Sequence, residues 1–163
     1  MITMTTLHHR LRALLLPPVL LVIFLLFDLL ASWPAITDLR SLLALSLSLC
    51  LAVGIGLLSL YLVITGLRQL VRHQTTFNAL HADKTTTLLT KGCYAFTRNP
   101  VYLGFVGLHL SAAILLGSIA GVLATPVLIA LISVLHIQVE EAAMHRLFGR
   151  EWETYSNKTG RWL

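Results

Sequence analysis

Apolar residues occur in four long runs along the chain, separated by polar segments. The runs cover about residues 13–33, 42–67, 101–117 and 119–139. A run of about 17 or more apolar residues has the length of a helix that crosses a bilayer. The pattern therefore predicts an all-α fold: a polytopic membrane helix bundle with about four transmembrane helices.

No internal repeat or linker divides the chain, so residues 1–163 are predicted to form a single integral-membrane domain. Pro17 and Pro18 stand near the start of the first run, where proline suits the first helical turn or kinks the chain. Residues 68–100 are the longest polar segment and are predicted to form a loop.

The segment 117–121, between the third and fourth runs, reads Gly-Ser-Ile-Ala-Gly and carries no charge. It suits either a tight helical hairpin turn or a small-residue packing face. We favour the turn, because both neighbouring runs then have membrane length. Pro126 is expected to kink the fourth helix.

An amphipathic helix is predicted over residues 140–156, after the fourth run. Ala143 and Leu147 are expected to share its apolar face, while its charged residues, Glu140 among them, stay in water.

Two features within the runs need an interpretation. Asp28 is an intramembrane carboxylate, which is a functional candidate by default, although snorkelling or a helix-to-helix hydrogen bond explains it as well. Gly54 and Gly56 resemble part of a dinucleotide-binding motif, but no strand precedes them. We interpret these glycines as positions of close helix packing.

Composition and charge support the membrane class. Of the 163 residues, 56% are hydrophobic and 12% are charged, where a soluble domain carries about a quarter charged residues. With four spans, Arg40 alone of the 12 lysines and arginines lies on the side opposite the termini. The positive-inside rule then places both termini and the polar segments in the cytoplasm, at the inner or cell membrane. The net charge of +5 follows the apolar runs rather than a recognition motif, which argues against nucleic acid.

The first polar block with candidate chemistry spans residues 86–104. Pro100 stands at the mouth of the third run, where its missing N–H costs nothing, and it pushes Asn99 away from helical geometry. Arg98 and Asn99 are thereby presented to the polar layer, and Tyr94 and Tyr102 offer rings with polar tips. The alternative is a plain loop-to-helix junction with an arginine anchor.

The second block holds Glu140 and Glu141, where the chain leaves the fourth run. Adjacent carboxylates on a helix point about 100° apart, so one faces the bundle and the other faces water. A carboxylate suits the ribose hydroxyls or the amino group of a nucleoside cofactor, and it favours a nearby sulfonium. A solvated charged face is the alternative.

Together the two blocks resemble the isoprenylcysteine carboxyl methyltransferase and phospholipid methyltransferase family of integral-membrane enzymes. The resemblance covers residues 86–163. It implies a cytoplasmic pocket for S-adenosylmethionine and an acceptor that approaches from the bilayer. Catalytic roles fall on Arg98, His136 and Glu140. Cofactor contact falls on Thr86, Thr87, Leu88, Leu89, Tyr94, Asn99, Pro100, Tyr102, Glu140 and Glu141.

Two departures from the family pattern concern the acceptor. Asn99 stands where eukaryotic members carry histidine. His136 stands about where carboxyl-methylating members place an arginine, and a neutral imidazole clamps a carboxylate less well than a guanidinium does. The acceptor is therefore left open between the carboxylate of a prenylcysteine-type substrate and a phospholipid amine.

Two other readings compete with the methyltransferase. His136, Glu140, Glu141 and His145 have helical spacings that suit a metal site, but no second histidine-rich cluster completes one, and we predict no metal. A small non-enzymatic membrane protein or transporter could use Asp28 and Glu140 as pathway carboxylates. The polar residues gather at one interface rather than at mid-span, which favours the enzyme. Cys50 and Cys93 are predicted to be free thiols.

Overall fold

The structure, a computed structural model, describes residues 10–32, 42–73 and 85–163, with only the backbone course for 42–46. Its regular elements are helical, with no strand among these residues. In chain order they are α2 (Pro17–Ser32), α3 (Leu42–Arg72), the 3-10 turn η2 (Gly92–Ala95), α4 (Pro100–Leu115), α5 (Ile119–Ile132), the π-helical turn η3 (Ser133–Ile137), α6 (Gln138–Phe148) and α7 (Arg150–Ser156). Residues 10–14 form a further short helical stretch before α2.

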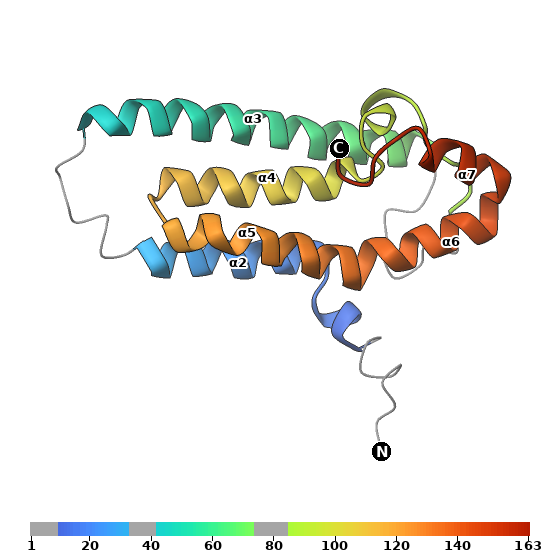
Figure 1. Cartoon of the computed structure of the whole chain (residues 1–163), viewed down its shortest axis with the longest axis horizontal. Helices are drawn as coiled ribbons and strands as arrows, with labels where there is room; N and C mark the ends of the chain where they lie inside the picture. Colours follow the sequence, from blue (N-terminus) through green and yellow to red (C-terminus); the bar gives the residue numbers. More distant parts are fainter. Residues whose placement is uncertain (1–9, 33–41, 74–84) are drawn as a thin grey trace, which may run out of the picture.

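Four long helices lie side by side as a bundle, and α4 contacts the other three (Figure 1). The most extensive contact is between α3 and α4, and α5 packs against both α2 and α4. α6 and α7 extend beyond one end of the bundle, where η2 and the C-terminus also lie (Figure 1). This polar end of the molecule holds the residues of both motif blocks.

Two apolar helices have the length and composition to cross a membrane: Leu47–Arg72 within α3, and Ile119–Phe148, formed by α5, η3 and α6 together. α2 and α4 are apolar but have 16 residues each. That is about 24 Å of helix, against a hydrocarbon core of about 30 Å. The all-helical fold is confirmed for the described residues, whereas four spans stay a prediction.

The helices end at other places than the apolar runs do. α3 continues to Arg72, so the predicted loop 68–100 begins later than its polar composition indicated. The fourth helix does not end at residue 139 but continues through η3 to Phe148. The predicted helix over 140–156 is wrong as one unit, because Gly149 has a φ of +48° and separates α6 from α7. Arg40 lies outside the described residues.

The expected faces of α6 are also partly wrong. Ala143 is buried as expected, but Leu147 is 45% exposed. Glu140 is not in open water, because it lies partly buried against α4. The apolar pattern of α6 alone does not show that α4 covers part of this helix.

The hairpin turn between the third and fourth runs is confirmed. Gly117 has a φ of +65°, a left-handed conformation that favours glycine. Ser118 then caps α5, because its hydroxyl accepts a hydrogen bond from the Gly121 N–H at 3.0 Å. Pro17 begins α2, which confirms proline in the first turn of the first helix.

Small residues allow α3 and α4 to approach closely. A Cβ on Gly104 would lie 2.7 Å from the backbone oxygen of Ser59, and a Cβ on Gly107 would meet the Ser59 hydroxyl. Further along, Gly56 faces Ser111, whose hydroxyl donates to the carbonyl of α3 residue Ala52 at 2.7 Å. Helices in lipid gain no hydrophobic drive from association, so close backbone approach and hydrogen bonds carry this contact.

Gly54 does not share this role. Nothing lies within 4 Å of the Cβ that it would gain. The packing interpretation is thus right for Gly56 and wrong for Gly54, because the two glycines point to different sides of α3.

We expect Gly104→Ala to lower the free energy of unfolding by about 1–3 kcal/mol, since its Cβ must displace backbone atoms of α3. Gly54→Ala is the matched control and should be neutral or stabilising by up to about 1 kcal/mol through helix propensity. Denaturant unfolding in detergent micelles measures both. Equal effects of the two substitutions would show that the α3–α4 approach does not depend on Gly104.

Candidate functional site

The C-terminal tail fastens onto the segment that leads into α4. The Arg98 N–H donates to the Gly160 carbonyl at 3.0 Å. The Thr97 hydroxyl and the Asn99 side-chain amide both donate to the Arg161 carbonyl, at 3.3 and 2.9 Å. Segments about sixty residues apart in the sequence are thereby joined, and the two motif blocks form one structure.

Glu141 lies between two arginines in this structure. It accepts from Arg98 Nη2 at 2.8 Å and from Arg161 Nε at 3.2 Å, and Arg161 Nη2 bonds its second oxygen. Hydrogen bonding to Glu141 raises the pKa of Arg161 further above its ordinary value. The other Arg98 amine, Nη1, donates to the carbonyls of Ser156 and Thr159 at 2.7 and 3.1 Å.

Protein groups therefore hold the Arg98 side chain on several sides. Its side chain is 13% exposed, and its guanidinium lies 5.5 Å from the ring centroid of Trp152 on α7. Arg98 was predicted to be catalytic, and that role stays a prediction; its guanidinium contacts Glu141, two backbone carbonyls and Trp152. This arrangement is that of a residue that positions α4 against α6 and the tail.

Two tyrosines near this network, Tyr94 and Tyr155, are buried. The Tyr155 hydroxyl donates to the Tyr94 carbonyl at 2.7 Å, and burial raises the pKa of Tyr155 to about 12. Burial likewise raises the pKa of Tyr94 well above its ordinary value, with Cys93, Tyr155 and Glu140 adding to the effect. Both phenols therefore stay protonated at neutral pH, and the Tyr94 phenol lies within electrostatic range of Glu140.

Glu140 meets Tyr102 across the contact between α6 and the first turn of α4. The Tyr102 hydroxyl donates to Glu140 Oε1 at 2.5 Å. The positive charge of Arg12, from the helical stretch before α2, acts on both groups, and Arg12 is 9% exposed. Tyr94, Tyr102 and Glu140 were all predicted to contact the cofactor, and the fold brings them together.

His136 lies in the π-helical turn η3 and is fully buried. Its Nε2 is 2.8 Å from the Leu15 carbonyl, so this nitrogen carries the proton and donates, since a carbonyl can only accept. The ring centroid lies 6.4 Å from that of Tyr102. His136 thus borders the Tyr102–Glu140 pair, while its Nε2 ties the chain before α2 to the fourth helix.

The remaining predicted contacts are more dispersed. Residues 86–89 form an irregular segment that is half-buried except at Thr86, which is exposed. Pro100 is buried where α4 starts against Gly66. Glu141 belongs to the arginine network rather than to the Glu140 side, so the two adjacent carboxylates point to different partners, and neither faces open water.

The comparison with known families decides the class. The sequence model described as phospholipid methyltransferase matches residues 47–151, well over half of the chain. The chain belongs to the phospholipid methyltransferase family. No curated protein and no solved structure matches it.

Membership of this family implies a methyltransferase that works in a membrane context, with S-adenosylmethionine as the implied methyl donor. The matched residues include Tyr102 and Glu140, whereas Arg12 and Arg161 lie outside them. The two long apolar helices agree with a membrane protein. The narrower resemblance to isoprenylcysteine carboxyl methyltransferases stays a prediction.

The Tyr102–Glu140 corner fits the chemistry of this cofactor. S-adenosylmethionine carries a carboxylate, an ammonium and a sulfonium, and the sulfonium at its reactive centre is a cation. Glu140 supplies a partly buried carboxylate, Tyr102 a ring in contact with it, and Tyr94 a ring within its electrostatic range. A negative charge and aromatic rings are the groups that a desolvated cation prefers.

The residues of the alternative metal site do not gather. His145 pairs with Glu153 on α7 at 3.1 Å in an exposed position, and His136 contacts Leu15. Within the described ranges, no group of three or more histidines, cysteines or carboxylates comes together. Cys50 and Cys93 are free thiols, as predicted.

Asp28 lies in a different part of the bundle, and its partner was not foreseen. Its carboxylate is 2.9 Å from His109 Nδ1, and both side chains are fully buried. His109 Nε2 lies 3.1 Å from the Gly121 carbonyl, and a Cβ on Gly121 would strike Asp28. One cluster thus joins α2, α4 and α5, which supports the helix-to-helix interpretation of Asp28.

Sequence reasoning missed three residues that build these sites. Arg12 looked like a basic flank of the first run, and Arg161 like part of a terminal tail. His109 is the one histidine in the third apolar run, which has no acidic residue, lysine or arginine, and this isolated polar position was a usable signal. Nothing local in the sequence linked Arg12 to Glu140 or Arg161 to Glu141.

We expect the Asp28–His109 pair to show strong coupling. Asp28→Leu or His109→Leu alone should lower the free energy of unfolding by about 3–5 kcal/mol, because each leaves a buried partner uncompensated. The double substitution should cost less than the sum of the two. Denaturant unfolding in micelles of all four proteins measures the coupling, and additive effects would contradict the pairing.

Glu141→Gln should release the C-terminal tail, since both arginines lose their shared charge. A loss of about 1–3 kcal/mol is expected for a pair that is mostly but not fully buried. Digestion by carboxypeptidase, followed by mass spectrometry, should remove residues 157–163 faster. Glu151→Gln, at an exposed position on α7, is the matched control, and equal digestion of both variants would exclude this role for Glu141.

Proposed function

We propose that the protein transfers a methyl group from S-adenosylmethionine to a lipid-like or small hydrophobic acceptor at the cytoplasmic face of the membrane. The observation that carries the proposal is the Tyr102–Glu140 contact. It places a carboxylate between two apolar helices, at the polar end of the bundle, within the residues that match the phospholipid methyltransferase family.

The roles of the side chains follow from charge and burial. Glu140 offers the negative charge that a sulfonium needs, and Tyr102 fixes the carboxylate by donating to one of its oxygens. Tyr94 adds a neutral ring within electrostatic range of Glu140. When bound, the cofactor supplies an activated methyl group for in-line displacement. Alignment and exclusion of water by these side chains can then provide most of the acceleration.

Arg98 acts in this scheme as a positioning residue. Its bonds to Glu141 and to the tail carbonyls hold the start of α4 at the level of α6. Because Tyr102 lies one turn beyond Arg98, this network sets the separation between Tyr102 and Glu140. Asn99 strengthens it through its bond to the Arg161 carbonyl.

A phospholipid amine is the acceptor that we favour over a prenylcysteine carboxylate. The family description names phospholipids. His136, which stands near the place of a carboxylate-binding arginine, is fully buried and donates to Leu15. It therefore offers no exposed cation for a carboxylate acceptor.

The proposed orientation places the polar end of the bundle in the cytoplasm, at the inner or cell membrane, with four spans. The basic side chains Arg12, Arg72, Arg98 and Arg161 belong to elements at this end, which supports that orientation through the positive-inside rule. A cytosolic cofactor would then reach Glu140 directly. The acceptor would enter from the bilayer between the apolar helices.

The transporter alternative is not favoured. It requires Asp28 and Glu140 as carboxylates of one pathway, but Asp28 is paired with His109 and Glu140 with Tyr102. Each is satisfied within its own cluster, and the family match points to methyl transfer.

The first test is calorimetric binding of S-adenosylhomocysteine to detergent-purified, lipid-supplemented protein. We expect saturable binding that Glu140→Ala weakens about 10- to 100-fold, since a charged hydrogen-bond partner is lost. Glu151→Ala, at an exposed position, should leave the affinity unchanged. No binding by a wild-type sample whose unfolding transition shows that it is folded would refute the proposed cofactor and thus the methyl transfer.

A further inference from the structure

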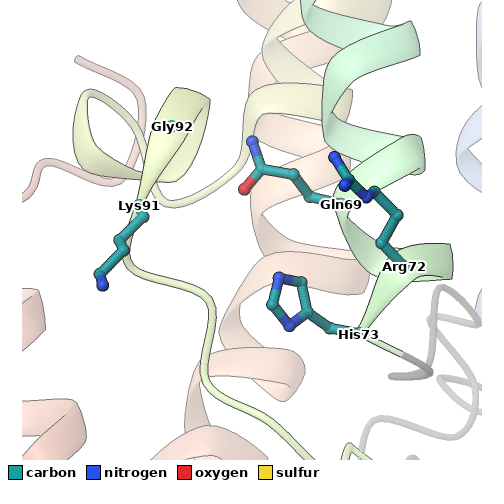
Figure 2. Close-up of a pocket in the computed structure, with 5 residues that line it drawn as sticks. All are labelled: Gln69, Arg72, His73, Lys91 and Gly92. Carbon is teal, nitrogen blue, oxygen red and sulfur yellow. The ribbon is translucent and has the colours of Figure 1, made fainter.

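A second candidate site lies at the end of α3, in a cleft of about 570 Å³. Gln69, Arg72 and His73 line one side, and Lys91 and Gly92, at the start of η2, line the other (Figure 2). The volume lies within the usual range for small-molecule sites, about 300–1,000 Å³. None of these residues belongs to the Tyr102–Glu140 corner.

The cleft is basic. Arg72 and Lys91 are cationic side chains, and His73 lines the cleft with them. Among the residues that the structure describes, no ion pair joins a carboxylate to Arg72 or Lys91. The cleft thus presents positive charge to a ligand.

A hydrogen bond and a close backbone approach fix the two sides of the cleft relative to each other. Gln69 Nε2 donates to Cys93 Sγ at 3.3 Å, which ties α3 to η2. Gly92 has a φ of +64°, and a Cβ at this position would strike the Gln69 amide. The first residue of η2 can therefore lie this close to Gln69 only because it is glycine.

The charge of the cleft selects its ligand. The reactive sulfonium of S-adenosylmethionine is a cation and fits Glu140 rather than a cleft lined by Arg72 and Lys91. An anion with several oxygen acceptors fits Arg72 and Lys91, because guanidinium and ammonium groups bind phosphate through charge-assisted hydrogen bonds. Since α3 is a membrane-length apolar helix, the cleft at its polar end lies at the level of lipid headgroups.

We propose that the cleft lined by Arg72, His73 and Lys91 binds the phosphate of a phospholipid headgroup and so selects a phospholipid as the acceptor. Neighbouring residues link the cleft to the methyl-transfer corner: Gln69 donates to Cys93, and the next residue, Tyr94, lies within electrostatic range of Glu140. In this proposal, the headgroup of a lipid held by its phosphate extends from the cleft toward that corner. The proposal deepens the proposed function and rests on it for the acceptor's role, but the binding itself can be tested alone.

The test is calorimetric binding to the full chain in a non-ionic detergent. The probes are dihexanoyl phosphatidic acid, dihexanoylglycerol (which has the same tails without the phosphate) and inorganic phosphate. We expect phosphatidic acid to bind at least about tenfold more tightly than dihexanoylglycerol. The double variant Arg72→Gln/Lys91→Gln should lose at least about tenfold in affinity for phosphatidic acid, given about fivefold for each cation.

The control variant Arg146→Gln/Arg150→Gln removes the same charge from exposed positions of α6 and α7 and should bind phosphatidic acid within twofold of the wild type.

An equal loss in both double variants would show a general charge effect and overturn the proposal. Dihexanoylglycerol binding as tightly as phosphatidic acid would overturn it too. Displacement of the lipid by an equal concentration of inorganic phosphate would assign the cleft to a soluble anion instead. If the double cleft variant does not fold, the single substitutions Arg72→Gln and Lys91→Gln serve in its place.

Binding of S-adenosylhomocysteine by the same proteins separates this proposal from the proposed function. The cleft variants should keep it, because Glu140 is untouched. Wild-type binding of phosphatidic acid without S-adenosylhomocysteine would remove the methyl-transfer proposal and leave the cleft. The opposite result would remove the cleft alone.

Discussion

The contact of Glu141 with Arg98 and Arg161 holds the polar end of the molecule together. One carboxylate joins α6, the start of α4 and the C-terminal tail. The other terminal nitrogen of Arg98, Nη1, donates to the carbonyls of Ser156 and Thr159. Helix ends leave carbonyl groups without partners, and here Arg98 donates to the carbonyl of Ser156 at the end of α7. The Tyr102–Glu140 corner depends on this contact, because it sets where α4 begins relative to α6.

The bundle itself is held by other means. Glycines and serines let α3 and α4 come close, and the buried Asp28–His109 pair joins α2, α4 and α5. The outer surface is apolar, with residues such as Leu30 and Leu57 well exposed. A helix bundle in lipid needs this division, because burying apolar side chains gives little drive where the solvent is apolar too.

The two proposed sites differ in charge. The first has the Glu140 carboxylate for the sulfonium of the proposed cofactor, and the second has Arg72 and Lys91 for the phosphate of the proposed acceptor. For methyl transfer to a lipid, this difference would let donor and acceptor each be recognised on its own.

The sequence by itself determined the helical class, the position of the turn at Gly117 and the two polar blocks, because apolar run length and glycine chemistry act locally. It also singled out Tyr102 and Glu140 through their resemblance to a family. Tertiary structure alone decided that the charge of Arg12 acts on Glu140 and that Asp28 pairs with His109. These contacts join residues far apart in the chain, and neither residue's neighbours encode its partner. The same holds for α6 and α7, whose break at Gly149 becomes evident only where the chain turns back to fasten its tail.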